Sequence, residues 1–168
     1  MALLVVCNAC ALLSAFQSPY VNYRNYVEGR LQIDKKFDRA KQIISVQVLV
    51  VTERLMKLQS ELSRGPTLDF KPNSKQLIVA INAISVGPLM TSDLQFTLGS
   101  RRALSVREIS DKAVLDTFYF FAKPFYQVFT VEFSDSSKNE ETLEIANSVH
   151  RFSTKVTFAE KSEMKASL

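Results

Sequence analysis

Two cysteines are the side chains of this sequence best suited to redox chemistry. Cys7 and Cys10 have the Cys-x-x-Cys spacing, in which a thiolate stabilised by a helix N-terminus is resolved by its neighbour. A redox domain would continue with alternating strands and helices, whereas a tyrosine-rich segment and a helical pattern follow here. We therefore expect the two thiols to pack on a helix, and we do not expect a disulfide framework to hold the fold.

The single histidine limits catalysis and metal binding in the same way. His150 is the only imidazole available to a nucleophile-base pair or a metal triad. It alternates in phase with Phe152, so we expect it to point into the core. One histidine and two cysteines also fall short of the four ligands of a structural zinc site. We therefore expect no catalytic residue, no metal ligand and no cofactor.

Paired carboxylates could share a proton in acid-base catalysis, and Glu140 with Glu141 is such a pair. The stretch 134–141 is polar and rich in turn residues, which predicts an exposed loop. In such a loop water would leave the acidity of both groups unchanged. We interpret them as surface charge.

Aromatic and basic residues near the start of the chain could bind a nucleic acid. Tyr20, Tyr23 and Tyr26 lie close to Arg24 and Arg30, and the chain has a formal net charge of +4. Acidic residues are interleaved with the basic ones, and no ribonucleoprotein or OB-type signature accompanies them. We expect these aromatic residues in a core or an interface and do not expect a nucleic acid partner.

The elements that would position these residues begin with helices. Tyr20, Tyr23 and Val27 recur at spacings of three and four, which predicts a short helix after Pro19. Asp34 is a candidate N-cap for a long amphipathic helix over 35–63, which Gly65-Pro66 would end.

The apolar stripe of this long helix is the clearest candidate for a binding site. A helix of about 28 residues is ~42 Å long, which exceeds what a small sandwich can cover. The stripe therefore either packs within the chain or docks other protein subunits or a second copy of this chain. The predicted partner-binding residues are Ile44, Val48, Val51, Leu55, Leu58 and Leu62.

Beyond Pro72 the apolar residues alternate and turn residues separate short runs, which predicts strands. The expected strands cover 76–84, 94–98, 104–109, 115–121, 126–133 and 143–158. The predicted fold class is α+β, with N-terminal helices followed by an antiparallel Ig-like β-sandwich. The expected units are a helical arm at 1–66, a sandwich at 67–158 and a polar tail at 159–168.

Three features of the strand region resemble a known family. They are the apolar strand closed by Pro88-Leu89, the sequence Tyr126-Gln127-Val128-Phe129-Thr130-Val131-Glu132, and Ile145-Ala146-Asn147-Ser148-Val149 before the last strand. In this order 77–158 resembles the luminal β-sandwich of the ribophorin II family, a non-catalytic subunit of oligosaccharyltransferase. The resemblance implies an accessory role in an endoplasmic reticulum complex. The family's helical repeat domain and transmembrane helices have no counterpart in this sequence.

The first residues bear on the compartment. The run 1–16 is apolar like the core of a signal peptide, but no Lys or Arg precedes it, and it is shorter than the ~20 residues that cross a bilayer. A buried helix, a membrane element and a signal segment all remain open, and association with a membrane would come through this run. We expect a membrane-associated or endoplasmic reticulum location if the resemblance holds, and an intracellular one otherwise.

The functional expectation is a non-enzymatic structural or interaction subunit that binds partners through the long helix and the sandwich surface. The alternative is a domain that binds a small molecule or a lipid, or an enzyme, with an aromatic-lined cavity. The residues expected to line that cavity are Phe118, Phe120, Phe129 and Phe133.

Overall fold

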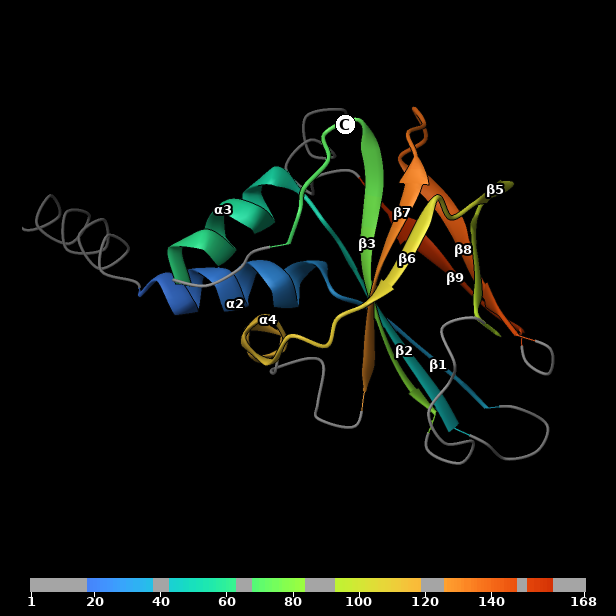
Figure 1. The fold of residues 1–168 in the computed structure, drawn as a ribbon, viewed down its shortest axis with the longest axis horizontal. Helices are drawn as coiled ribbons and strands as arrows, with labels where there is room; N and C mark the ends of the chain where they lie inside the picture. Colours follow the sequence, from blue (N-terminus) through green and yellow to red (C-terminus); the bar gives the residue numbers. More distant parts are fainter. Residues whose placement is uncertain are drawn as a thin grey trace, which may run out of the picture.

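The fold is known from a computed structural model, which describes residues 18–37, 43–62, 68–83, 93–118, 126–147 and 151–158. Helices lie together on one side of the molecule and strands on the other (Figure 1). Cys7, Cys10 and His150 lie outside the described residues, as do the segments 1–16 and 159–168. The expectations for them therefore stay predictions.

Five strands form the larger sheet, in which all neighbours are antiparallel. Its order is β1-β2-β3-β7-β6. The strands are β1 (Gln32–Phe37), β2 (Ile43–Val50), β3 (Ser74–Ala83), β7 (Gln127–Ser134) and β6 (Ser105–Glu108). Strand β3 lies at the centre and is apolar on both faces, as its sequence predicts.

Four strands form the second sheet, again with antiparallel neighbours. Its order is β5-β4-β8-β9. The strands are β4 (Gln95–Leu98), β5 (Arg101–Arg102), β8 (Glu140–Ala146) and β9 (Arg151–Thr157). The predicted final strand over 143–158 is thus wrong in one respect, because residues 143–146 belong to β8 and residues 151–157 to β9, and these two strands pair with each other.

The two sheets share one hydrophobic core. Alternate side chains of β2, β3 and β7 meet those of β4, β8 and β9, because successive residues of a strand point to opposite faces. Phe96 and Phe129 make a direct contact across this core, with ring centroids 6.0 Å apart. The large rings that dominate the composition therefore hold the two sheets together.

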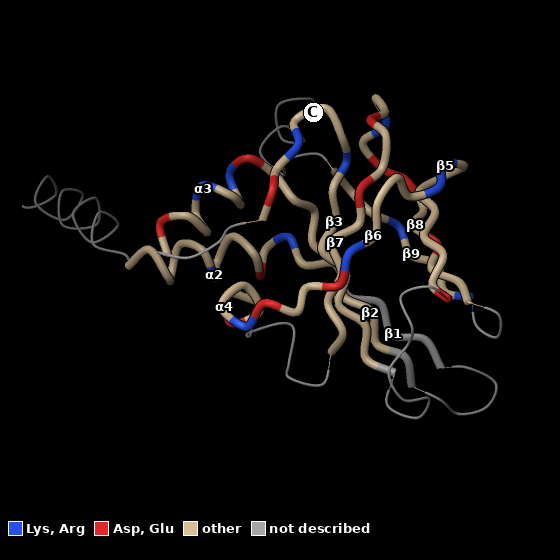
Figure 2. Tube along the Cα trace, viewed as in Figure 1, with Lys and Arg blue, Asp and Glu red and all other residues tan. Residues whose placement is uncertain are grey.

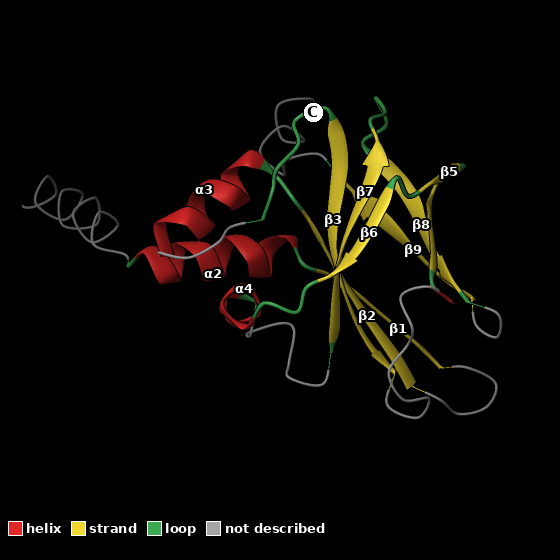
Figure 3. Ribbon diagram, in the orientation of Figure 1, coloured by secondary structure: helices red, strands yellow, loops and turns green. Residues whose placement is uncertain are grey.

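Helices cover the other face of the five-stranded sheet (Figure 3). They are α2 (Pro19–Arg30), α3 (Glu53–Leu62) and α4 (Lys112–Thr117). Tyr23 and Val27 of α2 and Leu55 of α3 are buried against Ile78 and Val128 of the sheet. The described residues thus form a mixed α/β fold with three helices and two antiparallel sheets.

The prediction of one amphipathic helix over 35–63 is wrong for most of its length. Residues 35–37 belong to β1 and residues 43–50 form β2, so among the described residues of this range only those of α3 are helical. Strand β2 contains two isoleucines and three valines, and β-branched residues favour an extended backbone. Asp34, the expected N-cap, lies within β1. Residues 32–37 and 43–50 therefore belong to the five-stranded sheet.

The prediction of a strand at 115–121 is also wrong for the residues that the structure describes. Residues 115–117 belong instead to helix α4, which begins at Lys112 because Asp111 is a good N-cap. The Asp111 carboxylate accepts hydrogen bonds from the backbone amides of Ala113 and Val114, at 2.8 and 3.3 Å. The short helix α2 is confirmed, with Ser18 as its N-cap and Pro19 at its first position.

Candidate functional site

The six predicted partner-binding residues do not share one surface. Val48 is buried between the two sheets, whereas Val51 and Leu55 are buried beneath the helices, on the opposite face of the five-stranded sheet. Ile44 lies in β2, and its side chain is outside the described part. Leu58 and Leu62 of α3 are half-buried at the edge of the helical cluster. These last two leucines remain accessible to a partner.

The four phenylalanines expected around a cavity are also separated. Phe118 is buried under the helices, whereas Phe129 and Phe133 are buried between the sheets. Phe120 lies outside the described residues. Because the sheet itself stands between the two groups, an aromatic cavity of this composition does not form.

On the exposed side of the helical layer, the ring and the hydroxyl of Tyr26 contact residues of both α2 and the start of α3. The guanidinium carbons of Arg30 and Arg54 lie 5.0 and 5.3 Å from the centroid of the Tyr26 ring, within the range of cation-π attraction. The Tyr26 hydroxyl lies 2.6 Å from Thr52 Oγ1. Thr52 in turn accepts from the amide of Leu55 and so caps α3. These contacts fix α2 against the start of α3.

A hollow of about 560 Å³ follows the solvent side of α3, and we call it the α3 groove. Its lining residues are Thr52, Glu53, Arg54, Lys57, Leu58 and Glu61. Charges of both signs occur on the helices that border it (Figure 2). The groove therefore offers one apolar contact, from Leu58, within a ring of polar and charged groups.

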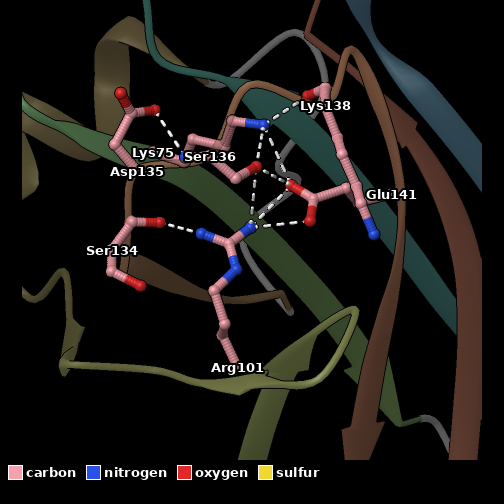
Figure 4. A network of polar contacts seen from close by, with 7 residues as sticks. All are labelled: Lys75, Arg101, Ser134, Asp135, Ser136, Lys138 and Glu141. Atoms are coloured by element: carbon pink, nitrogen blue, oxygen red, sulfur yellow. Dashed lines mark hydrogen bonds and ion pairs between the residues drawn. The ribbon is translucent and has the colours of Figure 1, made fainter.

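Between the sheets at one end of the core lies a polar cluster, which we call the ion cluster (Figure 4). Its members are the buried Lys75 and Glu141 and the partly exposed Arg101 and Ser136. Lys75 Nζ lies 2.9 Å from Glu141 Oε2, and Arg101 Nη2 lies 2.6 and 2.7 Å from the two carboxylate oxygens. The Ser136 hydroxyl donates to the same carboxylate at 2.9 Å. The side chains of Glu141 and Lys75 are only 4% and 9% exposed.

The strands position this cluster through simple alternation. Lys75 continues the inward stripe of β3 that includes Leu77, and Glu141 continues the inward stripe of β8 that includes Leu143. Arg101 follows a tight turn in which Gly99 has a φ of 61°. Glycine adopts this left-handed conformation at no steric cost, so the turn can bring Arg101 back over the carboxylate.

The electrostatics of the cluster are dominated by Glu141. Burial alone would raise the pKa of its carboxyl, but hydrogen bonds from Lys75, Arg101 and Ser136, together with the charge of Lys75, lower the pKa to about 2. The group is therefore ionised at physiological pH and stays ionised until the pH falls towards 2. An ionised, fully paired carboxylate has no proton to give and is a poor base, so the cluster is suited to joining the two sheets.

The prediction that Glu140 and Glu141 are both surface charge is half wrong. Glu140 pairs with Lys155 on the surface, with side chains 54% and 76% exposed, whereas Glu141 is buried. The sequence did contain the signal, since Glu141 has the same parity as Leu143 and Ile145. Because the residues before Glu141 are polar, the sequence did not indicate that strand β8 already begins at Glu140.

We expect the ion cluster to make the stability of the fold depend on pH in the acid range. The pKa of Glu141 lies at about 2 in the folded chain, below the ordinary value of 4.5. A lowered pKa stabilises the fold above pH 4.5, and the contribution disappears as the pH falls towards 2. Denaturant titrations at pH 7, 4.5, 3 and 2 should show a loss of up to about 3 kcal/mol from this group. The loss should be absent from the Glu141→Gln variant; an equal acid dependence in that variant would contradict the assignment.

A second polar contact joins the three helices. Gln59 is fully buried, and its Nε2 donates to Thr117 Oγ1 at 3.0 Å. Burial also raises the pKa of Tyr23 well above its ordinary value, although a hydrogen bond with Thr117 opposes the rise. Tyr23 is therefore neutral at physiological pH and contributes to packing and not to acid-base chemistry.

A cavity of about 240 Å³ opens beside the edge strand β6, and we call it the β6 cavity. Segment 68–71 forms one wall, and β3, β7 and β6 form the floor. The lining combines apolar residues with charges of both signs. It is the second candidate for a binding site, after the α3 groove.

None of the helices in the described ranges combines the length and the apolar character that a membrane-crossing helix needs. Comparison of the chain with protein-family models, with curated proteins and with solved structures finds no match.

Proposed function

We propose that the protein is a non-enzymatic interaction subunit of a larger assembly and that it binds a protein partner through the solvent side of α3. The observation that carries the proposal is the α3 groove, in which the half-buried Leu58 lies among charged residues. An apolar anchor surrounded by polar groups is the usual composition of a protein interface. Arg54 is already held against Tyr26, so binding would cost little side-chain entropy there.

The partner that fits this groove is an amphipathic helix of another protein. The groove extends over residues 52–61, which corresponds to roughly 14 Å of helix, or about two and a half turns of a partner packed alongside. Helices bind in such grooves through apolar residues spaced three and four apart. Glu53 and Glu61 together with Arg54 and Lys57 favour a partner helix that also carries charges of both signs.

The rest of the chain would serve as a rigid body for this contact. The two sheets share one core, and the ion cluster ties them together at its end. Two finer predictions are an Ig-like relation of these sheets and kinship with the ribophorin II family, and the kinship alone would make the assembly one of the endoplasmic reticulum. Both stay predictions, and the binding proposal does not depend on them.

The test is capture of partners from cells by the tagged full-length protein, compared between variants. Leu58→Glu places a charge at the apolar anchor and should lower partner recovery at least tenfold. Lys57→Glu reverses an exposed charge in the same groove and should lower recovery about threefold or more without affecting the fold.

The matched control is Leu104→Glu, because Leu104 is an exposed leucine, 65% accessible, that does not line the α3 groove. This variant should recover the partner as the unmodified protein does. Equal recovery by all three variants would exclude the α3 groove as the binding surface. Light scattering of the purified chain distinguishes a second copy of this chain from a different partner.

A further inference from the structure

The β6 cavity is a preformed feature of the fold. Gln76 holds segment 68–71 in place with two hydrogen bonds: its Nε2 donates to the Asp69 carbonyl at 3.1 Å, and its Oε1 accepts from the Lys71 amide at 3.1 Å. Lys71 Nζ also lies 2.6 Å from Glu132 Oε2 on β7. The wall and the floor of the cavity are thus tied to each other at three points.

The charges around this cavity are not all neutralised within the fold. Lys71 and Glu132 neutralise each other, whereas Glu108 keeps its negative charge and accepts a hydrogen bond from Gln127 at 3.4 Å. The side chains of Arg107 and Asp69 line the same cavity, and neither makes a hydrogen bond or ion pair with any residue in the described ranges. Within the described ranges, the guanidinium of Arg107 and the carboxylate of Asp69 therefore have no protein partner and can contact a ligand.

Aliphatic and uncharged polar side chains complete the walls of the cavity, and its volume is small. Val51, Leu68 and Ile109 supply aliphatic surface beside the two charges. A volume of about 240 Å³ equals that of about eight water molecules in the liquid and is below the usual size of pockets for drug-sized ligands. A ligand must therefore be small and must present an anion, a cation and an aliphatic group.

We propose that the β6 cavity binds a small aliphatic zwitterion, the chemical class of the free branched-chain amino acids. The ligand carboxylate pairs with the guanidinium of Arg107, which suits planar anions because it can donate two parallel hydrogen bonds. The ligand ammonium pairs with Asp69, and the side chain lies against Leu68 and Ile109. This site goes beyond the proposed interaction through α3 and does not require it.

The test is a titration of the full-length, isotope-labelled protein, followed by the amide signals of β6 and β7. The probes are L-leucine, isoamylamine, which lacks the carboxylate, and 4-methylpentanoate, which lacks the ammonium. We expect saturable shifts with L-leucine and at least tenfold weaker binding of both truncated probes. No saturable shift with L-leucine, or equal binding of either truncated probe, would overturn the proposal.

Variants assign the two charges. Arg107→Gln and Asp69→Asn should each weaken L-leucine binding at least tenfold, and since both side chains are exposed, the amide spectrum away from the cavity should stay unchanged. Arg102→Gln is the control, because Arg102 is an exposed arginine of β5, a strand of the other sheet, and does not line the cavity. Binding that survives Arg107→Gln, or that Arg102→Gln weakens equally, would contradict the site.

Discussion

Replacing Glu141 with Gln should destabilise the protein by about 3 kcal/mol, among the largest losses expected from one near-isosteric substitution. The variant leaves Lys75 and Arg101 close together without a counter-charge, and their side chains are only 9% and 21% exposed. Removing one member of a buried ion pair costs more than the pair contributed, because the remaining charge has lost its solvation. Urea unfolding at pH 7 measures the difference directly.

The neighbouring residue supplies the control. Glu140 also accepts from a lysine, Lys155 at 2.9 Å, but on the surface, so Glu140→Gln should change the free energy of unfolding by less than about 1 kcal/mol. Both variants remove one negative charge from adjacent positions of the same strand. Similar effects of the two would mean that the ion cluster is solvated and does not fasten the sheets.

The contrast between these two glutamates shows how far the sequence determines the site. Strand alternation places Glu141 inward and Glu140 outward once the start of β8 is known. The sequence does not indicate which cations pair with Glu141, because Lys75 and Arg101 come from strands 66 and 40 residues away along the chain. A cluster assembled from three strands of two sheets becomes visible only when the sheets are paired.

The fold itself was predictable where periodicity is unambiguous. The short helix α2 and the strands β3, β4, β6 and β7 follow from apolar spacing and turn residues. Strand β2 was not, since it is buried on both faces and its near-continuous apolar run fits a helical repeat and an alternating one equally well. The β6 cavity was also beyond reach, because its walls come from segments between Val51 and Glu132.

The apolar stripe predicted for one long helix is divided between the two faces of the five-stranded sheet, and its part in α3 gives the second large effect. Leu55→Ala should destabilise the protein by about 3 kcal/mol, because Leu55 is 1% exposed and the substitution leaves a cavity beneath the helices. Leu58→Ala, one turn further along the same helix, should cost only about 1 kcal/mol, since Leu58 is half-buried and its site can be filled by water. Thermal and urea unfolding of both variants provide the measurement.

The same two variants separate packing from binding. If α3 docks a partner through its groove, Leu58→Ala should weaken partner capture more than its small effect on stability explains. The reason is that, in the part of the chain that the structure describes, Leu58 is the only apolar residue that lines the groove. Leu55→Ala should leave capture by the folded fraction unchanged, because the buried side chain does not reach the surface. The reverse pattern, with Leu58 important for stability and Leu55 for binding, would require α3 to be rotated about its axis relative to the sheet. Such a rotation would remove Leu55 from its contacts with the helix-side core, so the pair of measurements tests the fold and the proposed interface together.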